Sequence, residues 1–124
     1  MTILVTGGLG YIGSHTVVAL MEAGYSVVIA DNLSNSKLEV LDVLQQITNE
    51  HIPFYKIDVT DEQVVNYLFK NHSIEGVIHF AGYKAVGESV SQPLKYYQSN
   101  LLSTITLANA CKQFNVKKFV FSSS

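Results

Sequence analysis

The segment Gly8-Leu9-Gly10-Tyr11-Ile12-Gly13 matches the pattern G-x-G-x-x-G and follows the short apolar run Ile3-Leu4-Val5. Read from Gly7, the same stretch is G-x-x-G-x-x-G. Glycines allow a tight turn that approaches a ligand closely, and a helix behind the turn points free N–H groups at an anion. A strand before this motif and a helix after it are the context in which it binds a dinucleotide pyrophosphate. The segment therefore predicts a strand, a phosphate-binding turn and a helix over about residues 11–23. The alternative is a glycine-rich turn without a ligand.

Outward from this turn, apolar runs alternate with helical patterns along the whole chain. The further predicted strands are residues 27–30, 53–57, 77–80 and 118–121, and the further predicted helices are residues 38–47, 60–71 and 93–114. This alternation predicts a parallel sheet with right-handed crossovers and helices on both faces. The expected fold class is α/β, a Rossmann-like doubly wound sheet with strand order 3-2-1-4-5. Since 124 residues leave room for one domain, residues 1–124 are predicted to be a single dinucleotide-binding domain.

Several local details are also predicted from the pattern. In the first helix, five residues recur at helical spacing and are expected to form one face: Ile12, Thr16, Ala19, Leu20 and Ala23. Residues 60–63 read Thr-Asp-Glu-Gln and look like a capping box that opens a helix. His15 and His79 are expected to be packing residues rather than catalysts.

The composition excludes several classes of protein. Apolar residues make up 48% of the chain and charged residues 15%, which argues against disorder. The net charge is −2 and all eight basic residues are lysines, so we expect no nucleic-acid partner. The single cysteine, Cys111, rules out an internal disulfide framework, and no cluster has metal-ligand spacing. The apolar start of the chain is too short for a membrane span or signal peptide, so a cytoplasmic protein without a membrane partner is expected.

Asp31 ends the second predicted strand, 18 residues after Gly13. A carboxylate at this position accepts hydrogen bonds from the adenosine ribose hydroxyls and repels a 2′-phosphate. NAD is therefore favoured over NADP, because the chain has no arginine to compensate and only Lys37 lies nearby. A solvated turn acid is the alternative for Asp31.

Other small or polar residues follow the remaining strands. Ligands of open parallel sheets bind beyond the carboxyl ends of the strands, where the strand order reverses. Asp58 follows the third strand and is expected to receive the adenine amino group or, alternatively, to cap a turn. Ala81 and Gly82 follow the fourth strand and would let the backbone pass close to the cofactor.

The segment from Thr6 to His15 resembles the opening of the extended short-chain dehydrogenase/reductases. Within that family, Asp31–Ser36, His79–Ser89, Pro93–Tyr97 and Phe121–Ser124 are similar to the UDP-glucose 4-epimerase (UDP-galactose 4-epimerase) branch. The likeness covers the whole chain, and the stretch from Lys84 to Ser89 within the second of these segments is its most specific part.

The resemblance implies NAD as cofactor and a UDP-sugar as substrate, with inversion at C4 of UDP-glucose or UDP-galactose in galactose metabolism. In that reaction the cofactor takes up a hydride and returns it to the other face of the sugar, so no net redox change occurs. Ser124 is implied to be the catalytic hydroxyl beside the sugar, and Lys84, Ser122, Ser123 and Ser124 are implied to bind the substrate. Together with the glycine motif, the resemblance assigns these residues to the cofactor: Gly7, Gly10, Tyr11, Ile12, Gly13, Asp31, Asn32, Asn35, Ser36, Asp58, Val59, Phe80, Ala81, Gly82, Lys84 and Asn100.

The proton-transfer pair of that family, a tyrosine with a lysine four residues later, does not occur in these 124 residues. We therefore expect a truncated enzyme without its sugar-binding domain, which binds NAD but does not epimerise UDP-sugars. The resemblance also implies a homodimer through the helix at residues 93–114, whose outer apolar side would otherwise contact the missing domain. Two other functions stay open: another nucleotide-sugar enzyme, such as a dehydratase or decarboxylase, or a non-enzymatic NAD-binding module.

Overall fold

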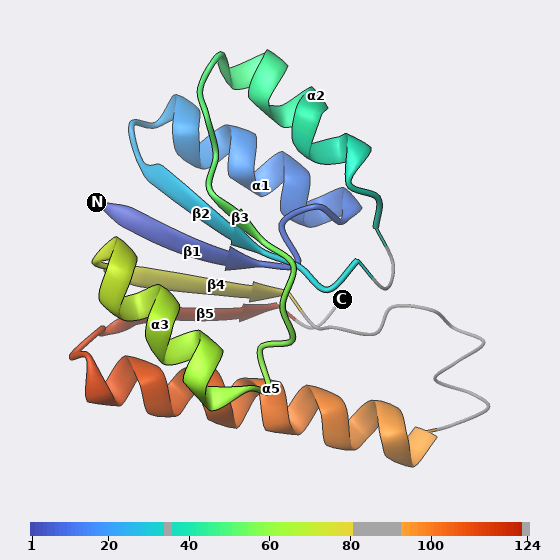
Figure 1. Ribbon diagram of the computed structural model, residues 1–124, viewed down its shortest axis with the longest axis vertical. Coiled ribbons are helices and arrows are strands. Elements are labelled where there is room, and N and C mark those ends of the chain that lie inside the picture. The colour runs from blue at the N-terminus through green and yellow to red at the C-terminus, as the bar shows by residue number, and fades with distance from the viewer. Residues whose placement is uncertain (34–35, 81–92, 123–124) are drawn as a thin grey trace.

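The computed structural model describes residues 1–33, 36–80 and 93–122, and it confirms the predicted parallel sheet (Figure 1). The strand order is β3-β2-β1-β4-β5, and each neighbouring pair is parallel. The strands are β1 Thr2–Thr6, β2 Ser26–Ala30, β3 Phe54–Tyr55, β4 Gly76–Phe80 and β5 Lys118–Ser122. The third strand is shorter than the predicted range of residues 53–57, because only two of its residues pair with β2.

Helices cover both faces of the sheet (Figure 1). One face carries α1 (Tyr11–Glu22) and α2 (Glu39–Thr48), and the other carries α3 (Glu62–His72) and α5 (Pro93–Gln113). Alternate residues of one strand serve opposite faces, as the pleat requires. In β1, Leu4 packs in the core under α3 and α5, while Ile3 and Val5 pack in the core under α1 and α2.

The inward face of α1 differs from the prediction. Gly13 and Val17 are its buried residues, whereas Ile12 is 49% exposed. Of the expected face, Leu20 packs partly against the core, whereas Ile12, Ala19 and Ala23 are exposed. Gly24 follows the helix with φ +97°, a left-handed conformation that glycine adopts without strain.

The N-cap of α3 also differs from the prediction. Asp61, not Thr60, is the N-cap, and its side chain accepts hydrogen bonds from the amides of Gln63 and Val64. The predicted capping box between Thr60 and Gln63 is therefore wrong, because the cap lies one residue later. A carboxylate cap satisfies helix amides that have no intrahelical acceptor.

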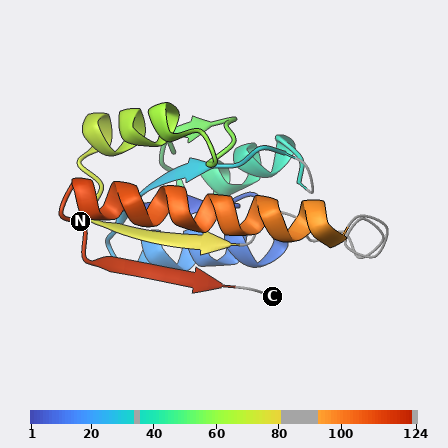
Figure 2. The ribbon, with the colours of Figure 1, turned by 90° about the horizontal axis from the view of Figure 1, so that it is seen from below.

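The long helix α5 runs antiparallel to β4 and β5, and its first turns extend past the carboxyl ends of these strands (Figure 2). Its inner side buries Leu107, Ala110 and Cys111 in the core. On the other side, Leu101 and Ile105 are each about half exposed. The sheet therefore covers only part of the apolar surface of α5, and β5 lies at one edge of the sheet that the described residues form.

Candidate functional site

The carboxyl ends of the four strands β1, β2, β4 and β5 meet at one edge of the sheet. Thr6 of β1 is in register with Ala30 of β2 and with His79 of β4, and Phe80 pairs with Ser122 of β5. Beyond β1, the Gly7 amide continues the ladder by donating to the Ala30 carbonyl (2.8 Å). The order of the strands reverses between β1 and β4, so the glycine turn lies at the position where open parallel sheets bind ligands.

The glycine turn packs its own backbone against the first turn of α1. A Cβ atom on Gly13 would lie 2.1 Å from the carbonyl oxygen of Gly7, so no side chain fits there. Gly7 has φ +70°, and a Cβ on it would lie 3.1 Å from the Cβ of Phe80 in β4. Gly10 caps α1 without a side-chain hydrogen bond to the helix amides. The first amides of α1 are therefore available to an anion, which the positive end of the helix dipole also favours.

Asp31 joins the glycine turn to the loop that follows β2. The Leu9 amide donates to Asp31 Oδ2 (3.1 Å), across 22 positions of sequence. The Leu33 amide (2.8 Å) and the Ser36 hydroxyl (2.9 Å) donate to Oδ1. The residue is only 8% exposed, so the carboxylate is not the solvated turn acid considered as an alternative. Asp31 organises both segments of the site, a role that its position in the motif did not predict.

Leu33 has a strained backbone in this loop. Its φ is +62°, in the left-handed region that costs a residue with a Cβ roughly 1 kcal/mol or more. Its hydrogen bond to the Asp31 carboxylate and its packing against the core under α1 and α2 hold it there. Asp31 therefore helps to hold the backbone conformation of Leu33.

A buried polar pair links the two central strands just below the turn. The Thr6 hydroxyl and Nδ1 of His79 share a hydrogen bond, and both residues are buried. His79 is thus an interior residue, as expected. Its partner Thr6 was not predicted, although the two residues share a register position in adjacent strands.

Tyr11 and Ile12 lie at the outer end of the turn, and both are exposed, Tyr11 by 82%. The ring of His15 lies 4.8 Å from the ring of Tyr11, and His15 Nδ1 donates to the Tyr11 carbonyl. The expectation that His15 packs in the interior is wrong, because the residue is exposed one turn along the outer face of α1.

Asp58 adopts the turn-capping arrangement considered as its alternative. Its Oδ1 accepts from the amide (2.9 Å) and the hydroxyl (2.8 Å) of Thr60, and the residue is exposed. Val59 beside it packs partly against the core under α3 and α5. The predicted contact of Asp58 and Val59 with adenine stays a prediction.

Some of the remaining predicted site residues lie in the described part of the chain, and others lie outside it. Phe80 and Ser122 end adjacent strands, Ser36 is half-buried on Asp31, and Asn32 is exposed beside it. Asn100 lies in α5, but its side chain falls outside the description. The predictions for the following residues also lie outside the described part of the chain: Asn35, Ala81, Gly82, Lys84, Ser123 and Ser124.

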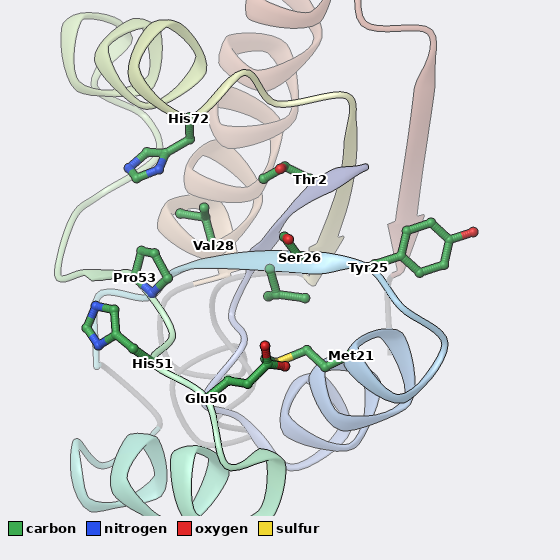
Figure 3. A pocket seen from close by; sticks show the side chains of 10 residues that line it. Thr2, Met21, Tyr25, Ser26, Val28, Glu50, His51, Pro53 and His72 are labelled. Carbon is green, nitrogen blue, oxygen red and sulfur yellow. The ribbon is translucent and has the colours of Figure 1, made fainter.

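A separate cavity of about 250 Å³ lies at the opposite edge of the sheet, at the amino ends of β1 and β2. Figure 3 shows His51 and His72 on either side of Pro53 along one flank, with Tyr25 at the far end. Within residues 1–33, 36–80 and 93–122, no group of three or more His, Cys, Asp or Glu could hold a metal ion. None of the helices in those same ranges is long and apolar enough to cross a membrane.

Comparison with known proteins agrees with this geometry. The UDP-glucose 4-epimerase of Bacillus subtilis is 55% identical over 124 residues, which are 100% of this chain and 37% of that protein. A crystal structure of UDP-glucose 4-epimerase from Bifidobacterium longum, in complex with NAD+ and UDP, is 48% identical and matches with a TM-score of 0.94. A UDP-glucose 4-epimerase from Stenotrophomonas maltophila, with bound NAD and formylated UDP-arabinopyranose, is 44% identical and also has a TM-score of 0.94. In both structures the match covers 100% of this chain and 37% of the other.

The chain thus spans a little over a third of the length of these relatives. The model of the NAD dependent epimerase/dehydratase family matches residues 3–124, which include the glycine turn, Asp31 and every described strand residue except Thr2. The chain therefore belongs to the NAD dependent epimerase/dehydratase family, and its strand order and the glycine turn after β1 agree with this.

Proposed function

We propose that this chain binds NAD across the carboxyl ends of β1 and β2, with the pyrophosphate at the glycine turn and the adenosine ribose at Asp31. The observation that carries the proposal is the hydrogen bond from the Leu9 amide to Asp31 Oδ2, which ties the two predicted contact points into one unit. The absence of side-chain space at Gly13 and of a side-chain cap at Gly10 fits a phosphate held by backbone amides. The NAD found in the related structures supports the same assignment.

The bound cofactor would supply reversible hydride transfer at C4 of the sugar. The residues of this chain would bind and orient it. The first amides of α1, beside Tyr11 and Ile12, would face the pyrophosphate, and Asp31 with its loop would hold the ribose. Phe80 beside Gly7 would line the cofactor at the carboxyl ends of β1 and β4. The other assignments implied by the family resemblance, including Lys84, Asn100 and Ser124, remain part of this proposal.

We further propose that, in a polypeptide as long as its relatives, this region serves epimerisation of UDP-glucose and UDP-galactose at C4. The 124 residues alone would bind NAD without turning over the sugar, because no tyrosine among them has a lysine four residues later. The half-exposed Leu101 and Ile105 on α5 support a homodimer through this helix. A cytoplasmic location also stays a prediction.

The cofactor proposal is tested by calorimetric titration of the purified chain with NAD and with NADP. We expect NAD to bind and NADP to bind at least about tenfold more weakly, because Asp31 disfavours a 2′-phosphate. In the Asp31→Asn variant this preference should shrink, whereas Asp42→Asn, an exposed acid on α2, should retain it. No binding at millimolar NAD to folded wild-type chain would refute the proposal.

The catalytic part is tested with a coupled assay of UDP-galactose conversion. The chain alone should give no conversion, and a polypeptide extended to the length of the relatives should convert UDP-galactose with NAD bound. Conversion by the 124 residues alone would contradict the assignment of proton transfer to residues outside them.

A further inference from the structure

The cavity at the amino ends of β1 and β2 lies in the place that a longer β3 would fill. Residues from both sides of the sheet line it: Val28 and His72 belong to the side of α3 and α5, and Met21 belongs to the side of α1 and α2. The two residues of β3 pair only with the last two residues of β2. Beside the first half of β2, the cavity therefore occupies the position of a neighbouring strand (Figure 3).

Pro53 explains why β3 does not continue along β2. The Ile29 amide donates to the Pro53 carbonyl (2.9 Å), so residue 53 directs its backbone groups at β2. The next bond of a parallel ladder would run from the amide of residue 53 to the Val27 carbonyl, but proline has no N–H group. One residue earlier, the Ile52 amide donates to the side chain of Gln45 in α2 (2.9 Å). The chain is therefore held away from β2 before it reaches Val27.

The peptide groups of Val27 face this cavity. The N–H and C=O groups of successive strand residues point alternately to the two neighbouring strands. Because the Ser26 amide donates to the Met1 carbonyl (3.0 Å), the groups of Val27 point away from β1. None of the described residues bonds to them on that side, and Val27 lines the cavity while being only 3% exposed. Buried peptide groups are almost always paired, so their partner is a water or a ligand in the cavity.

The size and the walls of the cavity limit which ligand fits. Its volume of about 250 Å³ is below the roughly 300–1,000 Å³ of sites for drug-sized molecules, which suits a single ring. The rings of His51, Pro53 and His72 form one flank (Figure 3). A hydrogen bond between His72 Nε2 and the Tyr55 hydroxyl (2.6 Å) fixes one of these rings. Glu50 and the two imidazoles do not favour one sign of charge, so the lining suits an uncharged ligand.

We propose that this cavity binds a planar, uncharged, single-ring cyclic amide, which pairs with Val27 in the place of the missing β3 residue. A cyclic amide carries N–H and C=O side by side in one plane. Its carbonyl accepts from the Val27 amide, and its N–H donates to the Val27 carbonyl. The site lies at the edge of the sheet opposite the glycine turn, so its ligand does not compete with the dinucleotide.

The test follows the backbone amides of the isotope-labelled chain by NMR during titration with 2-pyridone, a planar cyclic amide. We expect saturable shifts of the Val27 amide at millimolar concentration, the range usual for so small a ligand, and none of the Gly7 and Leu9 amides. The analogue 1-methyl-2-pyridone keeps the ring and the carbonyl but lacks the donor. It should bind at least about tenfold more weakly, because a hydrogen bond is lost and its methyl group meets the Val27 carbonyl.

Two variants alter the site itself. Pro53→Ala introduces an amide that can donate to the Val27 carbonyl and extend β3, so 2-pyridone should bind at least about tenfold more weakly. Ser26→Phe places a ring at the wall of the cavity and should also weaken binding, which repeats the test if Pro53→Ala does not fold. The matched control is Pro93→Ala, the same change in the other proline of the chain, at the start of α5 and the opposite edge of the sheet (Figure 2). It should bind 2-pyridone as the wild type does.

The outcomes separate this inference from the proposed function. If millimolar 2-pyridone leaves the Val27 amide unshifted, the cavity holds water only and the inference is refuted. If 1-methyl-2-pyridone or folded Pro53→Ala binds as well as the wild-type pair, pairing with Val27 is refuted. NAD binding is measured on the same samples and should not change with 2-pyridone. A chain that binds 2-pyridone at Val27 but not NAD would refute the proposed function and leave this site standing.

Discussion

The substitution Gly13→Ala tests the packing on which the site depends. Gly13 lies in the first turn of α1, where alanine is intrinsically better than glycine by about 1 kcal/mol. Propensity alone therefore predicts a more stable protein. The structure predicts the opposite, because the added methyl carbon would lie 2.1 Å from the Gly7 carbonyl oxygen and 3.0 Å from the Gly8 Cα.

The loss of stability in Gly13→Ala can be gauged from how far the glycine turn and α1 must separate. Ordinary contact begins near 3.4 Å, so the turn and the helix must separate by more than 1 Å. Overpacking against side chains typically costs about 1–3 kcal/mol. Here the obstructing atoms are backbone, which cannot rotate away, so we expect a net loss of at least about 3 kcal/mol. That is a large part of the roughly 5–15 kcal/mol by which a domain is stable.

Equilibrium unfolding in urea measures this loss. With a slope of about 1–3 kcal/mol/M, the midpoint of Gly13→Ala should fall by at least about 1 M. Gly10→Ala is the matched control: its methyl carbon would meet the same Gly7 oxygen at 3.4 Å, and its stability should change by no more than about 1 kcal/mol. If Gly13→Ala proves as stable as Gly10→Ala, the close contact between turn and helix is wrong.

Three further predictions concern stability without any ligand. Asp61→Ala removes the N-cap that accepts from the Gln63 and Val64 amides and should lower the free energy of unfolding by about 1 kcal/mol in urea titrations, whereas Asp42→Ala on α2 should change it by less than about 0.5 kcal/mol. Asp31→Ala should cost about 1–3 kcal/mol in the same experiment, because the Leu9 and Leu33 amides lose their acceptor; an unchanged midpoint would show that Asp31 does not organise the turn. Burial raises the pKa of Cys111 from 9.0 to about 11, so the unfolded chain loses this proton first as the pH rises. Stability should therefore fall by up to about 2 kcal/mol between pH 9 and 11, and the difference between wild type and Cys111→Ala should shrink over that window.

The sheet and the edge that carries the site follow from local signals. The glycine motif lies between a strand and a helix, and the remaining apolar runs alternate with helical patterns, so the strand order could be predicted. The carboxyl-end positions of Asp31 and Phe80 follow from the same alternation. These features depend on residues that are close in sequence, or on rules that hold for all parallel α/β sheets.

Other features depend on contacts that the sequence does not display. Apolar spacing suggested that Ile12 faces inward, but the contact between Gly13 and Gly7 turns α1 so that Gly13 and Val17 are buried instead. The bond between Leu9 and Asp31 joins positions 22 residues apart, and no local pattern marks the backbone amide as its donor. The shortness of β3 likewise depends on pairing that the apolar run does not reveal, because only Phe54 and Tyr55 are in register with β2, opposite Ile29 and Ala30.

The position of β1 in the sheet has a consequence for synthesis on the ribosome. This strand is made first but lies in the centre, between β2, which follows within about twenty residues, and β4 at Gly76–Phe80. Synthesis proceeds at about 5–20 residues per second. After β2 has paired with one edge of β1, the other edge therefore stays unpaired for several seconds until β4 is made. An unpaired apolar edge is a template for joining another chain. A nascent chain stalled before residue 76 would therefore carry this exposed edge and should depend on chaperones until β4 emerges.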